Sequence, residues 1–387
     1  MLNARRIPLA WKNLTHEPRR LLIAVGGIGF AVVLICMQLG FRNALFDSTI
    51  ELHRSLNADI VMTSAARYTL SVRETFSRRR LYQAESCPGV AAAYPLYIEM
   101  ARSVWKNPET GQGHLIRILA FDPAAPVLDL VGIDALASEL IKPRTVLADE
   151  RSKADYGKLA TGETSELAGR ETKIIGRFRL GTDFANDGNL IMSADNYANY
   201  FGYRGQADKG LGEVDVGLIT VKPGASVAQV LEELRRELPE DVRVMTKDQF
   251  IEQELRFWRD STPIGFVFGL GTAMGFIVGV VICYQVLYGD IDDHMAEFAT
   301  LKAMGYRNVY FVGMVLQEAL LLSIFGFIPG VLVSGALYKV LEWATGLLLD
   351  LTLSRAASVL ALTVLMCVVS GCLAMRRLLA ADPAELF

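Results

Sequence analysis

Four long runs of hydrophobic residues alternate with charged and mixed segments along this chain. They cover residues 21–41, 263–288, 310–341 and 356–375. Only the third run contains charges, Glu318 and Lys339. As helices, all four are long enough to cross the hydrocarbon core of a bilayer, roughly 30 Å. The first run is longer than the apolar part of a signal peptide and no small-residue cleavage site follows it, so we expect it to remain as a membrane span.

The long polar stretch between the first two runs predicts one folded domain over residues 57–247. Short apolar segments bounded by Gly, Asp and Asn clusters predict strands, at residues 58–63, 115–121, 173–178, 190–192 and 216–221. An amphipathic helix is expected after Ser226, with Pro239 beyond its end. The pattern predicts an α-helical membrane protein with four transmembrane helices, arranged 1+3, and a large α+β extracytoplasmic domain between the first and second.

The segments that flank this domain, 42–56 and 248–262, carry apolar stripes at helical spacing. The stripes consist of Phe41, Leu45, Thr49, Leu52 and Leu56, and of Ile251, Leu255 and Trp258. Apolar residues that recur every three or four positions indicate amphipathic helices. We interpret both segments as helical extensions of the membrane spans that form a stalk, although ordinary surface helices would show the same pattern.

The distribution of Lys and Arg predicts the orientation. Basic residues gather before the first span, after the fourth and in the loop 289–309, whereas the loop 342–355 has only Arg355. Both termini, including the tail 376–387, and the loop 289–309 are therefore expected in the cytoplasm. The short loop 342–355 and the large domain are expected outside the cytoplasm.

The composition agrees with a chain that lies partly in lipid and partly in water, because 52% of the residues are hydrophobic and 21% are charged. The net charge of −3 argues against a nucleic-acid partner, which would require a basic face. Of the five cysteines, only Cys87 lies in the large domain, so this domain cannot hold an internal disulfide.

Small residues recur at four-residue spacing in two of the spans. In the second span they are Gly265, Gly269, Gly271, Gly275 and Gly279, and in the third span Gly326, Gly330 and Ser334. Such faces let helix backbones approach closely in lipid. We expect the glycines of the second span to pack against other helices and to line a dimer face.

Recognisable catalytic chemistry is missing from the sequence. It holds no GxxxxGK[ST], HExxH, GxSxG or kinase signature. We therefore predict no enzyme, no catalytic residues, no metal and no cofactor. The acidic group between Asp290 and Glu297 is interpreted as solvated carboxylates that suit a helix N-terminus. Glu318 lies at shallow depth, where it can reach the interface or pair with a neighbouring helix.

The loop between the second and third spans carries the most informative motif. EFATLKAMG, residues 297–305, predicts a short helix ended by Gly305. It resembles the loop of the MacB/FtsX-type permease superfamily, where an E-x-A-x-L-K-A-x-G pattern precedes the third span. The opening AWKNLTHEPRRLLIAVGGIGFAV and the ending ADPAEL also resemble that superfamily, which implies a cytoplasmic amphipathic helix over residues 1–20.

Within the superfamily, the chain looks most like the DevC-type permeases of cyanobacteria. Segments 176–193, 261–306 and 317–330 carry this likeness, which covers essentially the whole chain. The departures are Phe298, where the family often has tyrosine, and Arg307–Asn308 after the glycine.

The resemblance implies a homodimer that binds a separate DevA-like ABC ATPase, which holds ATP and Mg²⁺. It also implies a DevB-like (HlyD-type) membrane fusion protein and, through it, a TolC-like outer-membrane channel, with a glycolipid or other periplasmic cargo. The spans are then expected in the inner membrane of a bacterium, with the large domain in the periplasm. The expected ATPase contact consists of Glu297, Phe298, Leu301, Lys302 and Met304, with Gly305 permitting the turn. An FtsX-like protein that activates a periplasmic hydrolase, and a lipoprotein-releasing permease, remain open as alternatives.

Overall fold

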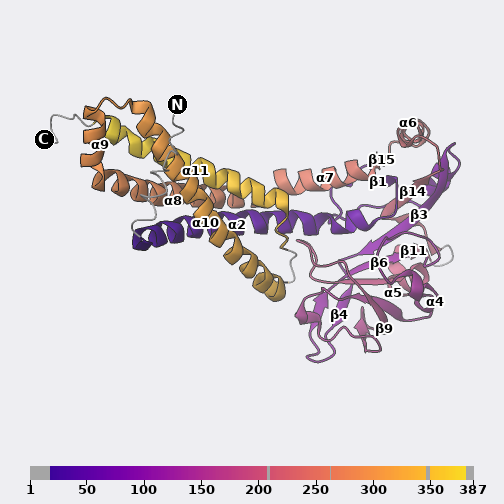
Figure 1. Cartoon of the computed structure of the whole chain (residues 1–387). Helices are drawn as coiled ribbons and strands as arrows, with labels where there is room; N and C mark the ends of the chain where they lie inside the picture. Colours follow the sequence, from indigo (N-terminus) through magenta and orange to yellow (C-terminus); the bar gives the residue numbers. More distant parts are fainter. Residues whose placement is uncertain (1–17, 207–209, 262, 346–348, 381–387) are drawn as a thin grey trace. The chain divides into compact units, whose positions relative to one another are not determined.

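The computed structural model describes residues 18–206, 210–261, 263–345 and 349–380 (Figure 1). The chain divides into two compact units. One, called the helical unit, is built from residues 1–43, 264–341 and 349–387. The other, called the inserted domain, is built from residues 44–263 with 342–348.

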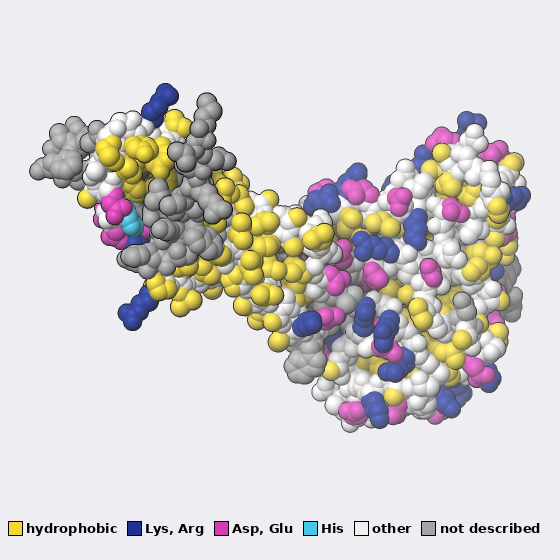
Figure 2. Space-filling view, viewed as in Figure 1, with side chains coloured by type: hydrophobic (Ala, Val, Ile, Leu, Met, Phe, Trp, Pro, Cys, Tyr) yellow, Lys and Arg dark blue, Asp and Glu magenta, His cyan; other side chains and the backbone are white. Residues whose placement is uncertain are grey.

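Four long helices and one short helix make up the described part of the helical unit. They are α2 (Pro18–Ser55, whose part from Ala44 onward belongs to the inserted domain), α8 (Ile264–Asp293), α9 (Met295–Ala303), α10 (Asn308–Thr345) and α11 (Leu353–Ala380). The four long helices are each apolar enough to cross a membrane, as the sequence predicts. Their surface is largely hydrophobic (Figure 2), as expected for side chains that meet lipid rather than water.

The two predicted stalk segments differ in the structure. α2 continues without interruption to Ser55, so the first span does extend as a helix. The second segment forms a separate helix, α7 (Lys247–Asp260), which opens with a capping box between Thr246 and Gln249. α8 begins only at Ile264, directly after Pro263, which lacks a backbone N–H and is favoured at helix starts. The prediction that 248–262 prolongs the second span is therefore wrong.

The inserted domain is built on an 11-stranded mixed sheet with the order β15-β1-β14-β3-β6-β10-β7-β9-β8-β4-β5. Its strands are β1 (Ile60–Ser64), β3 (Val90–Glu99), β4 (Val104–Lys106), β5 (Gly113–Leu115), β6 (Arg117–Phe121), β7 (Thr145–Asp149), β8 (Thr164–Leu167), β9 (Arg170–Phe178), β10 (Asn189–Ser193), β14 (Val216–Val221) and β15 (Val242–Thr246). β10 pairs with β6 and β7 with β9 in parallel, and the other pairs are antiparallel. The five predicted strands are all present.

Side chains from both faces of the sheet are buried, so the domain has two apolar cores. Along β1, Ile60 and Met62 belong to one core, whereas Val61 belongs to the other. This alternation follows from the period of two in a strand. α3 (Arg79–Glu85), α5 (Ala194–Tyr200) and α6 (Val227–Glu237) contribute to the first core, and the ends of α2 and α7 with α4 (Ala137–Leu140) contribute to the second.

Short elements complete the domain. They are the paired strands β2 (Phe76–Ser77) and β13 (Glu213–Val214), the paired strands β11 (Gly205–Gln206) and β12 (Gly210–Leu211), and the 3-10 helices η1 (Asp134–Leu136), η2 (Ala154–Tyr156) and η3 (Gly202–Arg204). The predicted N-terminal helix over residues 1–20 lies outside the described residues, except for Pro18–Arg20 at the start of α2.

Candidate coupling and transmission sites

The EFATLKAMG motif forms the short helix α9 and a sharp turn after it. Gly305 has a φ of +94°, in the left-handed region that only glycine enters without strain. The N–H of Gly305 donates to the Lys302 carbonyl at 3.0 Å, and the N–H of Tyr306 donates to the Leu301 carbonyl at 3.2 Å. These two bonds define a Schellman motif, which ends the helix. The predicted role of Gly305 in permitting the turn therefore fits the geometry.

The predicted ATPase-contact residues divide between two environments. Met304 is 64% exposed, and Glu297 is exposed as well. Phe298 is only 4% exposed, because its ring packs edge-on against Phe311 with the centroids 5.9 Å apart. Leu301 is half-buried against the same helical core, and Lys302 is half-buried. In this structure, Phe298 anchors α9 to α10 and does not lie on the surface that sequence reasoning assigned to it.

Polar contacts connect the end of α8, directly before α9, to three other helices. The Arg20 guanidinium at the start of α2 forms an ion pair with Asp293. His294 Nδ1 lies 2.9 Å from the Asp290 carbonyl oxygen. The Asp290 carboxyl is also hydrogen-bonded to Glu318 of α10, whose side chain is buried. Asp290 and Asp293 belong to α8, so these contacts connect α8 to α2 and α10, and His294 joins them from the N-cap of α9. Asp292, Asp293 and Glu297 are exposed to solvent, whereas Asp290 is partly buried.

The glycines of α8 pack within the protomer. A Cβ at Gly275 would lie 3.3 Å from Ile35 of α2, and one at Gly279 would lie 2.9 Å from the Ala31 Cβ. A Cβ at Gly271 would collide with Gln38. At these three glycines, α2 of the same chain occupies the face that was predicted to meet a second protomer. Gly269 has open space around it, and Gly265 is half-buried.

The glycine row of α10 packs on the same helix. Cβ atoms at Gly326 and Gly330 would press on Ile28 and Val32 of α2. The hydroxyl of Tyr338 further along α10 donates to the Cys36 carbonyl. α2 is therefore held on two sides by rows of small residues, which allow close approach between helices in lipid.

Within the inserted domain, the end of α2 meets α7 at a buried carboxylate. Glu254 of α7 is 2% exposed and lies 3.5 Å from His53 Nε2 of α2. It accepts hydrogen bonds from Thr69 Oγ1 at 2.6 Å, the Leu70 N–H at 2.9 Å and Trp258 Nε1 at 2.8 Å. Burial opposes ionisation, but His53 and these donors outweigh it and lower the pKa of Glu254. We call this group the Glu254 junction.

We expect Glu254→Gln to destabilise the inserted domain by roughly 1.5–3 kcal/mol at neutral pH, the range for hydrogen bonds to a charged group. Because the folded-state pKa lies below the ordinary 4.5, this stabilisation is complete above pH 4.5 and is lost as the pH falls through the lowered value. Thermal unfolding of the unmodified chain and of the Glu254→Gln variant between pH 7 and 3 checks this. The difference between their unfolding temperatures should shrink as the pH falls, and a growing difference would contradict the prediction. Glu252→Gln, at an exposed position on the same helix, is the control.

A second buried charged group lies next to the Glu254 junction. Asp215 is fully buried between Arg67 and Arg204, each with a side chain 2% exposed, and it pairs with both. It also accepts the Ile98 N–H at 2.9 Å. Burial raises the pKa of Asp215, and the two guanidinium groups oppose that rise. Arg67 Nη1 donates to the Leu70 carbonyl at 3.2 Å, so this triad is contiguous with the Glu254 junction.

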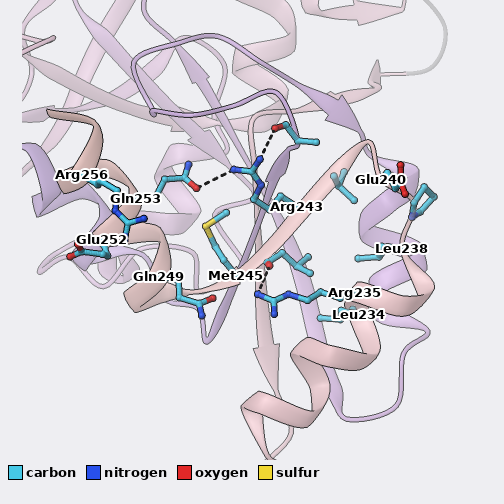
Figure 3. A pocket seen from close by; sticks show the side chains of 14 residues that line it. Leu234, Arg235, Leu238, Glu240, Arg243, Met245, Gln249, Glu252, Gln253 and Arg256 are labelled. Atoms are coloured by element: carbon cyan, nitrogen blue, oxygen red, sulfur yellow. Dashed lines mark hydrogen bonds and ion pairs between the residues drawn. The ribbon is translucent and has the colours of Figure 1, made fainter. Parts of the chain in front are cut away.

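Figure 3 shows a groove between α6, β15 and the start of α7, with a cavity volume of about 670 Å³. β15 is an edge strand of the sheet. Its outer side is partly covered by the chain itself, because Arg235 donates to the Val244 carbonyl at 3.4 Å and the Thr246 N–H donates to Gln249 Oε1 at 3.1 Å. Such capping protects an edge strand from pairing with another chain.

The sequence did not lead us to predict the Glu254 junction or the buried group around Asp215. For the Glu254 junction, however, the sequence does contain an indication. His53 and Glu254 fall on the apolar stripes of their helices, where a polar residue implies a specific partner. Arg67 lies in a loop, Arg204 ends η3 and Asp215 lies between β13 and β14, so no regular spacing indicates this group. Among the described residues, no group of three or more His, Cys, Asp and Glu side chains is placed to hold a metal.

Comparisons with known proteins match both the inserted domain and the helices that follow it. The family model of the MacB-like periplasmic core domain matches residues 21–237, and that of the FtsX-like permease C-terminal region matches residues 268–383. An uncharacterised ABC transporter permease of Methanocaldococcus jannaschii is 23% identical over 194 residues, which cover 48% of this chain and 45% of the relative. The chain therefore matches less than half of that relative's length.

Three solved structures are similar to about half of the chain. The periplasmic region of MacB from Actinobacillus actinomycetemcomitans has a TM-score of 0.36 at 10% identity, covering 51% of this chain and 92% of that structure. The extracellular domain of the noncanonical ABC-type transporter YknZ from Gram-positive bacteria has a TM-score of 0.33 at 11% identity. It covers 49% of this chain and 100% of that structure. A domain of a permease protein from Porphyromonas gingivalis has a TM-score of 0.31 at 15% identity. It covers 50% of this chain and 88% of that structure.

Four helices long and apolar enough to cross a membrane, with one large α/β domain inserted between the first and second, define a protein of the permease class. The MacB-like match covers more than half of the chain and precedes the FtsX-like match. The chain belongs to the MacB/FtsX-like family of ABC transporter permeases.

Proposed function

We propose that this chain is the membrane subunit of an ABC-type export complex, and that it transmits movement from a separate cytoplasmic ATPase to a periplasmic adaptor. The observation that carries the proposal is the form of α9. It presents Met304 and Glu297 outward, while Phe298 anchors it in the helical core. A short helix with an exposed apolar end suits insertion into a groove of a partner protein.

The contacts at the end of α8 support transmission of a displacement. Because α9 begins directly after His294, a displacement of α9 moves the end of α8, which contacts α2 through the Arg20–Asp293 ion pair and α10 through Asp290 and Glu318. α2 then runs as one uninterrupted helix to Ser55. A continuous helix transmits axial movement better than a chain with a flexible break. The Glu254 junction receives the end of α2, because His53 belongs to that helix.

The Lys and Arg bias supports an orientation with α9 and both termini in the cytoplasm of a bacterium and the inserted domain in the periplasm. The chain works as a homodimer, using the exposed apolar side of α8, which includes Phe266, Leu270 and Met274. The glycine face is already occupied within the protomer.

The particular complex follows from the likeness to DevC-type permeases. A DevA-like ATPase binds ATP and Mg²⁺, a DevB-like (HlyD-type) membrane fusion protein docks on the inserted domain, and a TolC-like channel completes the export route for a glycolipid or other periplasmic cargo. The segment 176–193, which carries part of this likeness, is firmly held in the fold. Asp183 accepts hydrogen bonds from Arg117, Ala185 and Asn186, and Phe184 stacks on Trp258 at the junction.

Affinity purification of the chain from its native host, followed by mass spectrometry, tests the proposal. We expect an ABC ATPase and an HlyD-type adaptor to copurify, and ATP hydrolysis by that ATPase to rise when the chain is present. Absence of any nucleotide hydrolase from the purified complex would refute it. The FtsX-like match also allows a signalling function, which would be indicated by a periplasmic hydrolase in place of the adaptor. Captured lipoproteins would indicate a lipoprotein-releasing permease.

A further inference from the structure

Three exposed arginines of the inserted domain lie over tyrosine rings. The Arg102 Cζ atom lies 4.4 Å from the ring centroid of Tyr203, and the Arg73 Cζ atom lies 5.3 Å from the same centroid. The Arg170 Cζ atom lies 5.9 Å from the ring centroid of Tyr200. None of the three arginines forms an ion pair with a carboxylate of the described residues. We call this group the arginine–tyrosine surface.

The tyrosine hydroxyls are fixed, so the rings have set orientations. Tyr203 donates to the Glu99 carboxylate, which is buried and also accepts the N–H groups of Ala101 at 2.9 Å and Arg102 at 3.1 Å. Tyr200 donates to the Glu171 carbonyl at 2.7 Å. A cation held over an aromatic ring loses less conformational freedom when it binds an anion, so these arginines are partly pre-organised.

A cavity of about 550 Å³ adjoins the surface. Arg102, Lys106, Tyr200 and Phe201 contribute to its walls, and small residues such as Gly113 and Ala168 also line it. Its one lining carboxylate, Glu166, lies 3.4 Å from Lys106 Nζ. The cavity therefore combines an excess of positive charge with apolar area, which suits a ligand that carries both carboxylates and apolar side chains.

The surface is connected to the Glu254 junction through buried contacts. Arg204 follows Tyr203 directly in sequence and pairs with Asp215, which also pairs with Arg67. Arg67 contacts the Leu70 carbonyl, and the Leu70 N–H donates to Glu254. These contacts place the arginine–tyrosine surface at the opposite end of a buried polar chain from the Glu254 junction.

We propose that the arginine–tyrosine surface docks an acidic segment of a partner protein, namely the periplasmic adaptor of the complex; this inference rests on the proposed function. The charge favours a segment with several carboxylates over a single phosphate, because Arg73 and Arg102 share the ring of Tyr203 whereas Arg170 lies over the separate ring of Tyr200. Arginine also binds carboxylates in a bidentate manner, which provides specificity.

Photo-crosslinking in the native host tests this proposal on the full-length chain. A benzophenone amino acid replaces Val104, which is 43% exposed and lines the cavity. We expect it to crosslink to an adaptor segment rich in Asp and Glu, identified by mass spectrometry. The double variant Arg102→Glu/Arg170→Glu should reduce the crosslink by about tenfold or more, because like charges would then face each other. Arg236→Glu, at an exposed arginine of α6, should leave it unchanged.

Restoration of the crosslink by Asp/Glu→Arg changes in the captured segment, in combination with the double variant, would establish the charge pairing. A crosslink that reaches only lipid, reaches a segment without acidic residues or persists in the double variant overturns the proposal. Copurification of the ATPase is measured in the same samples. If the ATPase is retained and the Val104 crosslink is absent, the docking surface alone is refuted. Loss of the ATPase from the unmodified chain refutes the proposed function itself.

Discussion

A chain in which Asp215 is replaced by asparagine is expected to unfold its inserted domain on the order of 10 °C below the unmodified protein. Asp215 is the carboxylate between Arg67 and Arg204, and all three side chains are buried. The substitution keeps the shape of the side chain but leaves two buried guanidinium groups without a counter-charge. Removal of one partner from a buried ion pair destabilises by about 3–5 kcal/mol, and here two cations lose their partner.

Thermal unfolding of the detergent-solubilised full-length chain, followed by near-ultraviolet circular dichroism, measures this effect. Asp241→Asn provides a control with the same chemical change, because Asp241 pairs with Arg80 at 2.8 Å but is half exposed. Exposed ion pairs contribute about 0–1 kcal/mol, so the control should unfold within a few degrees of the unmodified chain. Equal shifts for the two variants would show that the triad contributes no more than a surface pair.

The second large effect is expected at α9. Met304→Glu should abolish copurification of the ATPase and the stimulation of its hydrolysis, because a charge would be forced into an apolar groove of the partner. Burial of such a charge without a partner weakens binding by about 3 kcal/mol or more, which is over a hundredfold in affinity. Met304 is 64% exposed, so the change should leave the fold of the helical unit intact.

Met304→Leu is the matched control, since it keeps an apolar side chain of similar volume and should retain ATPase binding. Leu301 is a less suitable position because it packs partly against the helical core, so a charge there would disturb the fold and the interface together. An ATPase that binds Met304→Glu with undiminished affinity would place the coupling contact elsewhere. Membrane insertion and expression of both variants are checked by the amount of chain in purified membranes.

The comparison of Phe298 with Met304 shows what sequence reasoning can resolve in the coupling loop. Both residues occupy the motif, and helical spacing lets both project from α9. The pattern cannot indicate which side of a short helix faces its own bundle, because that depends on where the ring of Phe311 lies. Gly305 was predictable, since a glycine after a short helix is the common signature of a left-handed C-terminal turn.

The glycines of α8 illustrate a related limit. Their four-residue spacing predicts a close helix contact, and close contacts are present at Gly275 and Gly279. Spacing alone does not identify the partner, because a helix of the same chain and a helix of a second protomer would favour the same small residues. In the same way, the apolar stripe on residues 248–262 predicted a helix but not its separation from α8 before Ile264.

By itself, the sequence determined four helices apolar enough to span a membrane, one inserted mixed domain and the short helix α9 with its terminating glycine. These features follow from hydrophobic periodicity and local backbone preferences, which act over a few neighbouring residues. Only the tertiary structure decided that Asp215 neutralises two distant arginines, that His53 meets Glu254, and that Arg102 and Arg73 share the ring of Tyr203. Such contacts join residues from separate strands, helices and loops, so their partners are set by the order of strands in the sheet and the packing on its faces, which no local pattern records.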